Sequence, residues 1–121
     1  MKGVQFIKVF RSNFIQIAPK LSGGAVIVMS LIAPYIAYRS NLVCKGSNGN
    51  DGTPLNNDDI EGITGFSKPT IIKIMNELVE HRVLARTKVG HSYQYYANPY
   101  IYCCGTRINK TLETMFKYYK G

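Results

Sequence analysis

The sequence has few acidic residues, and none in its first fifty positions. Seven Asp and Glu stand against fifteen Lys and Arg, which gives a formal net charge of +8 and a pI of about 9.5. Four of the seven acids lie between Asp51 and Glu61, so residues 1–50 and 81–121 are strongly basic. A basic field of this size favours a polyanionic partner such as nucleic acid or an anionic membrane surface, although a solvated, solubilising surface is the simpler alternative.

The chain also lacks the motifs of common enzymes. It has no Gly-rich phosphate-binding loop, no Gly-x-Ser-x-Gly elbow and no His-Glu-x-x-His pair. Its two histidines, His81 and His91, do not form the paired-histidine metal motif that nicking replication enzymes combine with a tyrosine. We therefore expect a protein that is not an enzyme and that uses no metal or other cofactor.

Cysteine is scarce, and the three thiols (Cys44, Cys103 and Cys104) include no Cys-x-x-Cys pair. An odd number of cysteines without metal-ligand spacing fits a reducing cytoplasm, where thiols serve as small apolar residues. A redox switch is the alternative interpretation of the adjacent Cys103 and Cys104, but we favour the role of small apolar residues. We therefore expect a cytoplasmic protein.

No apolar run is long enough to cross a bilayer, and the alternating pattern after Lys2 does not predict a signal peptide. The longest apolar stretch, residues 25–38, has fourteen positions and is interrupted by Ser30 and Pro34. Because about 20 apolar residues are needed to span a membrane, we expect no membrane partner. The stretch instead predicts a buried helix, from about residue 24 to 39, that Pro34 bends or ends.

The length of 121 residues, 45% of them hydrophobic, is that of one globular domain. We predict an α+β fold with a winged helix-turn-helix core over residues 22–98. An N-terminal extension over 1–21 is expected to hold a strand (residues 4–10) and a short helix (14–21). A C-terminal extension over 99–121 is expected to hold an amphipathic helix.

A short helix is predicted over residues 57–64, with Asn56 or Asn57 as its N-cap. Gly65 suits the left-handed residue that ends a helix and begins a sharp turn. Gly62 is expected to let the following helix approach closely.

A second helix is predicted to begin after Ser67, which is expected to cap it, and Pro69 is tolerated in its first turn. Its apolar residues recur at spacings of three and four, which predicts one inward face: Ile71, Ile74, Met75, Leu78 and Val79. Two alternating segments follow, at residues 83–87 and 93–97, joined by a Gly-containing loop at 88–92. This pattern predicts a β-hairpin.

The outward face of the second helix offers hydroxyl, amide and ammonium groups, which can bond base edges and phosphates. Each lysine alone is better explained as a solvated surface residue, so the joint placement carries the prediction. Together with the hairpin, the predicted DNA-binding residues are Ser67, Lys68, Pro69, Thr70, Ile72, Lys73, Asn76, Arg86, Lys88 and His91. The clustered tyrosines of residues 93–102 and 118–119 could stack on single-stranded bases, but packing of a sheet is the favoured interpretation.

Residues 108–119 have the apolar spacing of an amphipathic helix. Its stripe consists of Ile108, Leu112, Met115, Phe116 and Tyr119. Because one winged helix contacts only a short DNA site, we predict a homodimer on the basis of this stripe and of the buried-helix character of residues 25–38.

Several segments together resemble the small replication proteins of firmicute plasmids and phages, the RepL type, over roughly residues 6–105. The matching segments are Phe6-Ile7-Lys8-Val9-Phe10, Ser67-Lys68-Pro69-Thr70-Ile71, Leu78 through Arg86, and Tyr96-Ala97-Asn98-Pro99-Tyr100-Ile101 followed by Gly105. This resemblance implies binding of a replication origin and recruitment of host replication proteins without nicking. The Ser67-to-Thr70 and Lys88-to-Ser92 segments are also similar to centromere-binding segregation proteins of the TubR type.

The predicted function is therefore sequence-specific binding of double-stranded DNA by a plasmid or phage protein that initiates or controls replication. A transcriptional repressor and a segregation adaptor are alternatives of the same winged-helix type. A protein–protein interaction module with incidental basic charge is the alternative from a different class.

Overall fold

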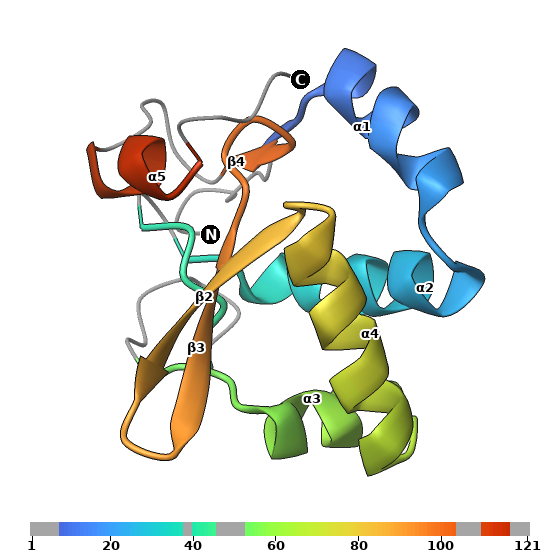
Figure 1. Cartoon of the computed structure of the whole chain (residues 1–121), viewed down its shortest axis with the longest axis vertical. Coiled ribbons are helices and arrows are strands. Elements are labelled where there is room, and N and C mark those ends of the chain that lie inside the picture. The colour runs from blue at the N-terminus through green and yellow to red at the C-terminus, as the bar shows by residue number, and fades with distance from the viewer. Residues whose placement is uncertain (1–7, 38–39, 46–52, 104–109, 117–121) are drawn as a thin grey trace, which may run out of the picture.

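The computed structural model describes residues 8–37, 40–45, 53–103 and 110–116. Short 3-10 helices span Ala18–Lys20 and Ala33–Tyr35. The fold is therefore α+β, as the sequence predicted (Figure 1). Its elements, in chain order, are β1 (Lys8–Val9), α1 (Arg11–Ile17), α2 (Gly23–Ile32), α3 (Asn57–Thr64), α4 (Lys68–Glu80), β2 (Leu84–Val89), β3 (Ser92–Ala97), β4 (Tyr102–Cys103) and α5 (Lys110–Met115).

In the described part of the chain, two antiparallel strand pairs make up the β-structure: β1 with β4, and β2 with β3. Residues 42–44 add isolated bridges beside these pairs. The Val43 amide donates to the Tyr95 carbonyl at 2.8 Å, so this segment lies along β3. Cys44 is buried there, whereas Cys104 and the side chain of Cys103 lie outside the described part of the chain.

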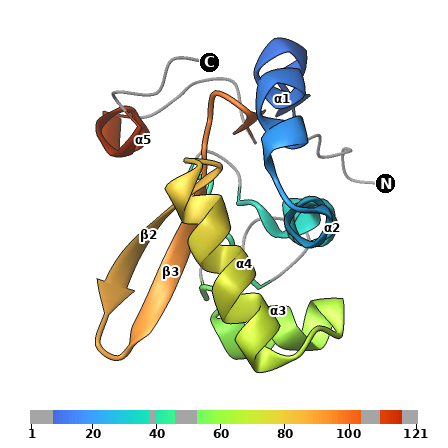
Figure 2. The ribbon, with the colours of Figure 1, turned by 45° about the vertical axis from the view of Figure 1, so that its right-hand side comes forward.

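Helix α4 lies between α2 and the β2–β3 hairpin (Figure 2). Its close contact with α2 occurs at Gly24, where an added Cβ would lie 3.0 Å from Cδ1 of Ile74. The expected close approach at Gly62 is wrong, because a Cβ built at Gly62 has no neighbour within 4 Å. Glycine thus permits close helix packing at α2 and not at α3.

Helix α2 is shorter than the predicted helix over 24–39. It ends at Ile32 and continues as a single 3-10 turn that contains Pro34, because proline has no amide hydrogen to continue the helical ladder. Its inner side belongs to the core, with Ala25, Val28 and Ile32 fully buried. Among the described residues, no helix combines the length and apolar character needed to cross a bilayer.

The N-terminal elements differ from their predicted bounds. The strand expected over 4–10 is seen at Lys8–Val9, and residues 1–7 lie outside the described part. The helix expected over 14–21 begins earlier, at Arg11, and its α-helical part ends at Ile17.

Most of the described part of the C-terminal apolar stripe, which was predicted to form a dimer interface, is buried within the chain itself. Leu112 and Phe116 are each 1% exposed, and Met115 is half-buried. An interface at Leu112 and Phe116 is therefore incorrect, because the chain itself already covers these side chains. Ile108 and Tyr119 lie outside the described residues.

Two buried asparagines satisfy backbone groups near the end of the hairpin. Asn98 donates from Nδ2 to the carbonyl of Arg82 at 2.7 Å and accepts from the amide of Tyr100 at 2.8 Å. Asn41 donates to the carbonyls of Ala97 and Tyr102. Buried backbone groups need such partners. These contacts therefore give Asn98 a structural role at the Asn98-Pro99 step.

A carboxylate joins α4 to the start of α2. Glu77 accepts hydrogen bonds from the backbone amide and the hydroxyl of Ser22, each at 2.7 Å, and the Ser22 hydroxyl caps α2 by accepting from the Ala25 amide at 3.2 Å. Burial alone would raise the pKa of Glu77, but the Ser22 bonds together with nearby His81 and Lys73 lower it below its usual value. The charged form of Glu77 is therefore favoured by folding.

This network predicts a pH-dependent contribution to stability. A depressed folded-state pKa stabilises the fold above the unfolded value, near 4.5, and that contribution is lost as the pH falls through the folded-state pKa. Glu77→Gln should lower the free energy of unfolding by about 1 kcal/mol at pH 7, and the deficit should shrink below about pH 4. Urea unfolding between pH 3 and 7 measures it, with exposed Glu80→Gln as the control. A deficit that is constant with pH would contradict the assignment.

Candidate nucleic-acid interface

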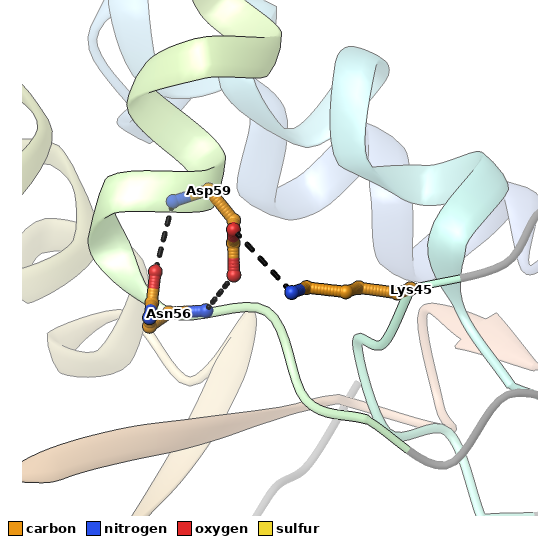
Figure 3. Close-up of polar contacts among 3 residues, drawn as sticks. All are labelled: Lys45, Asn56 and Asp59. Carbon is orange, nitrogen blue, oxygen red and sulfur yellow. Dashed lines mark hydrogen bonds and ion pairs between the residues drawn. The ribbon is translucent and has the colours of Figure 1, made fainter.

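Helix α3 begins with a reciprocal pair of hydrogen bonds. Asn56, not Asn57, is its N-cap: Oδ1 of Asn56 accepts from the Asp59 amide at 2.9 Å, and Oδ2 of Asp59 accepts from the Asn56 amide at 3.0 Å (Figure 3). The Lys45 Nζ lies 3.9 Å from Oδ1 of Asp59. Such a capping box satisfies two amides that the helix leaves open, and it fixes where α3 starts.

The turn between α3 and α4 has the predicted geometry. Gly65 adopts φ 76° and ends α3 with its amide bonded to the Glu61 carbonyl, a left-handed conformation that glycine adopts without steric cost. Ser67 occupies the N-cap position of α4 in an extended conformation, and Pro69 lies in the first turn. The Ser67 side chain does not cap the helix as expected, since its hydroxyl lies 2.9 Å from the Thr70 hydroxyl instead.

Helix α4 has one buried face and one exposed face. Ile71, Ile74, Met75 and Leu78 are at most 5% exposed, which confirms the predicted inner face. The opposite positions are exposed and recur at the spacing of one helical face. The exposed residues among the first nine positions of α4, called the α4 outer face from here on, are Lys68, Pro69, Thr70, Ile72, Lys73 and Asn76, and acidic Glu80 is exposed at the far end of the helix.

The β2–β3 hairpin is longer than predicted, because Val89 pairs with Ser92 across a two-residue turn. Side chains alternate between the two faces of a strand pair. On one face, buried Leu84 and Tyr95 give way toward the turn to Lys88 and Tyr93, which are exposed. We call residues 88–93, which include exposed His91, the hairpin tip.

Arg86 connects this face of the hairpin to α4. Its Nη1 donates to Oδ1 of Asn76 at 2.6 Å, and its guanidinium carbon lies 4.5 Å from the ring centre of Tyr93. At the base of the hairpin, the Tyr95 hydroxyl donates to Oδ1 of Asn57 at 2.7 Å. Burial raises the pKa of Tyr95, an effect that nearby Arg86 opposes in part. The hairpin is thus tied to both α3 and α4.

Charge is distributed unevenly over this region. Lys73 and Lys88 have no ion-pair partner among the described residues, whereas the Lys68 Nζ lies 3.9 Å from Oδ1 of Asp58 in a solvent-exposed pair. A surface hollow beside the turn is lined by Asp58 and Glu61. An anion would therefore be repelled at the start of α3 and attracted along the α4 outer face and the hairpin tip.

The structure places the sequence-predicted DNA-binding residues at the start and outer face of α4 and on the β2–β3 hairpin, which the Arg86–Asn76 bond joins. All but one are exposed; the exception is Arg86, which is half-buried and engaged with Asn76. Tyr93, which is 37% exposed, was not among the predicted site residues. The sequence pattern does not single it out, because its place opposite Lys88 depends on the exact hairpin register.

Comparisons of the chain with protein-family models, with curated proteins and with solved structures give no significant match. Within the described ranges, no group of three or more His, Cys, Asp and Glu side chains could hold a metal ion. The geometry and charge of this surface are therefore the observations that bear on function.

Proposed function

We propose that the chain is a winged-helix protein that binds double-stranded DNA with sequence preference. In this proposal the α4 outer face enters the major groove, and the hairpin tip contacts the flanking backbone. The observation that carries it is the two-sided character of α4, whose apolar side is buried while Lys68, Thr70 and Lys73 are exposed on the other.

The dimensions of the elements suit a groove. Thirteen residues make α4 about 20 Å long, and a major groove about 12 Å wide admits one α-helix. Ile72, 42% exposed between polar neighbours, suits the methyl group of thymine. The hairpin that carries Lys88 and His91 is joined to α4 through the Arg86–Asn76 bond, so the backbone flanking the groove would pass along it.

The biological role that we propose follows the resemblance of the chain to small plasmid and phage replication proteins: binding of an origin, without nicking, to initiate or control replication. Two alternative roles, repression of transcription and attachment of a segregation apparatus, would use the same DNA-binding surface. Sequencing of duplex fragments selected by the purified protein discriminates among them. Fragments from an origin support the replication role, whereas fragments from promoters or centromere-like repeats contradict it.

A homodimer is part of this proposal, because one winged helix contacts only a short site. Its interface excludes Leu112 and Phe116, which the chain covers itself. Sedimentation at micromolar concentration should show a dimer, at least on DNA. A monomer with and without DNA would contradict it.

Exposed Ile72 on α4 and exposed Tyr93 on the hairpin favour a second candidate, a protein partner. Salt dependence separates the two functions. Several phosphate contacts predict a steep loss of DNA affinity between 50 and 200 mM salt, whereas a surface that serves a protein partner predicts no tight DNA binding even at low salt.

Lys68→Ala/Lys73→Ala should weaken DNA binding. Each lost phosphate contact reduces the slope of log K against log salt by about 0.9, so the double variant should lower it by about 2. Fluorescence anisotropy on a selected site measures the slope. Lys20→Ala/Lys110→Ala removes the same charge from exposed positions on other elements and should change it much less. Equal salt slopes for the wild type and for folded Lys68→Ala/Lys73→Ala would show that DNA binds elsewhere on the protein.

Asp58→Asn should strengthen DNA binding, because it frees Lys68 from an exposed ion pair and removes a charge that repels phosphate. An exposed pair is worth up to about 1 kcal/mol, so the affinity should rise about 2- to 5-fold. Anisotropy at low salt measures it. Glu113→Gln, at an exposed position of α5, makes the same change in net charge. An equal rise in both variants would contradict a local effect.

A further inference from the structure

We propose that Arg86 is a positioning residue for base recognition: it holds the Asn76 side chain so that the NH2 group of the amide faces the DNA. Arg86 then acts through Asn76 and not as a phosphate contact. The inference rests on the proposed function of the α4 outer face, and it specifies how one base pair is selected there.

The hydrogen bond between the two side chains fixes the orientation of the amide. A guanidinium group can only donate, and in an asparagine amide only Oδ1 can accept. The Nη1–Oδ1 distance of 2.6 Å is short even for a charge-assisted bond. Oδ1 of Asn76 therefore points toward the hairpin, and Nδ2 is the polar atom left on the exposed side of α4.

Arg86 is itself held in place from the hairpin. Its guanidinium stacks on the Tyr93 ring at 4.5 Å, a favourable contact for a cation. Its strand neighbour across the sheet is Tyr95, which is buried and bonded to Asn57 of α3. Because the base of the hairpin is anchored in this way, the guanidinium can impose its position on Asn76, which is exposed at the surface.

The orientation has a consequence for base choice. An unconstrained asparagine pairs with adenine by accepting from N6 and donating to N7. With Oδ1 directed to Arg86, Asn76 offers donors, which match the two acceptors of guanine, N7 and O6. We therefore expect the wild-type protein to prefer guanine over adenine at the base pair that Asn76 contacts.

Lys88 provides the matched comparison. It lies on the same strand face as Arg86, two residues closer to the turn, and is exposed without an ion-pair partner in the described part of the chain. A phosphate contact at Lys88 would add affinity uniformly over sequences and steepen the salt dependence. A positioning role for Arg86 would instead change sequence preference and leave the salt slope nearly unchanged.

The experiment selects DNA from randomised duplex pools with wild type, Arg86→Ala, Asn76→Ala, Arg86→Ala/Asn76→Ala and Lys88→Ala, and then measures salt slopes on the wild-type site. Arg86→Ala should shift one selected position from guanine toward adenine by at least about 5-fold. Adding Arg86→Ala to Asn76→Ala should cause no further shift. Lys88→Ala should lower the salt slope by about 0.9 without changing any position. Thermal unfolding verifies that each variant is folded.

The outcomes separate this inference from the proposed function. Absence of DNA binding by the wild type would overturn both. Binding by the wild type with a uniform loss of affinity in Arg86→Ala, and a slope lowered as in Lys88→Ala, would identify Arg86 as a phosphate contact and overturn the inference alone. If neither Arg86→Ala nor Asn76→Ala changes the base preference at any selected position, the inference alone is also overturned.

Discussion

The packing of one side of α4 determines which side chains its other side presents to solvent. Ile71, Ile74, Met75 and Leu78 are buried along the length of the helix, and full burial of such a side chain contributes about 1.5–3 kcal/mol. An exposed ion pair such as Lys68–Asp58 contributes at most about 1 kcal/mol. Apolar burial therefore sets the rotation of α4, and the exposed lysines follow from it.

Polar contacts then fix the neighbours of this helix. Glu77 binds the first turn of α2 through Ser22 on one side, and Asn76 binds the hairpin through Arg86 on the other. These two residues are adjacent in the sequence, yet they face different elements because successive helical positions point about 100° apart. The result is a helix whose outer face and flanking hairpin have a defined mutual orientation.

The parts of the fold that could be predicted are those with local causes. Asn56 and Gly65 delimit α3 through a side-chain cap and a left-handed residue, and Pro34 ends α2 because it lacks an amide hydrogen. The exposed side of α4 followed from the spacing of its apolar residues, so most of the candidate site was predicted as well. Each of these signals lies within a few residues of the structure that it determines.

The features that escaped prediction depend on contacts between distant segments. Gly24 and Gly62 both lie in helices, and only the placement of α2 against Ile74 makes the first a point of close approach. The stripe of Leu112 and Phe116 has the period of a surface helix, but the rest of the chain buries it. The Arg86–Asn76 bond likewise requires the hairpin register, which a pattern of alternating residues does not define to a single residue.

We propose that the α4 outer face and the hairpin tip together form one nucleic-acid surface. Backbone amide chemical shifts, recorded while a mixed-sequence DNA duplex is added at low salt, locate the bound surface residue by residue. We expect the perturbations to concentrate on residues 67–76 and 88–93, with α1 and α5 little affected. Perturbations centred on α1, α2 or α5, or none at saturating DNA, would contradict it.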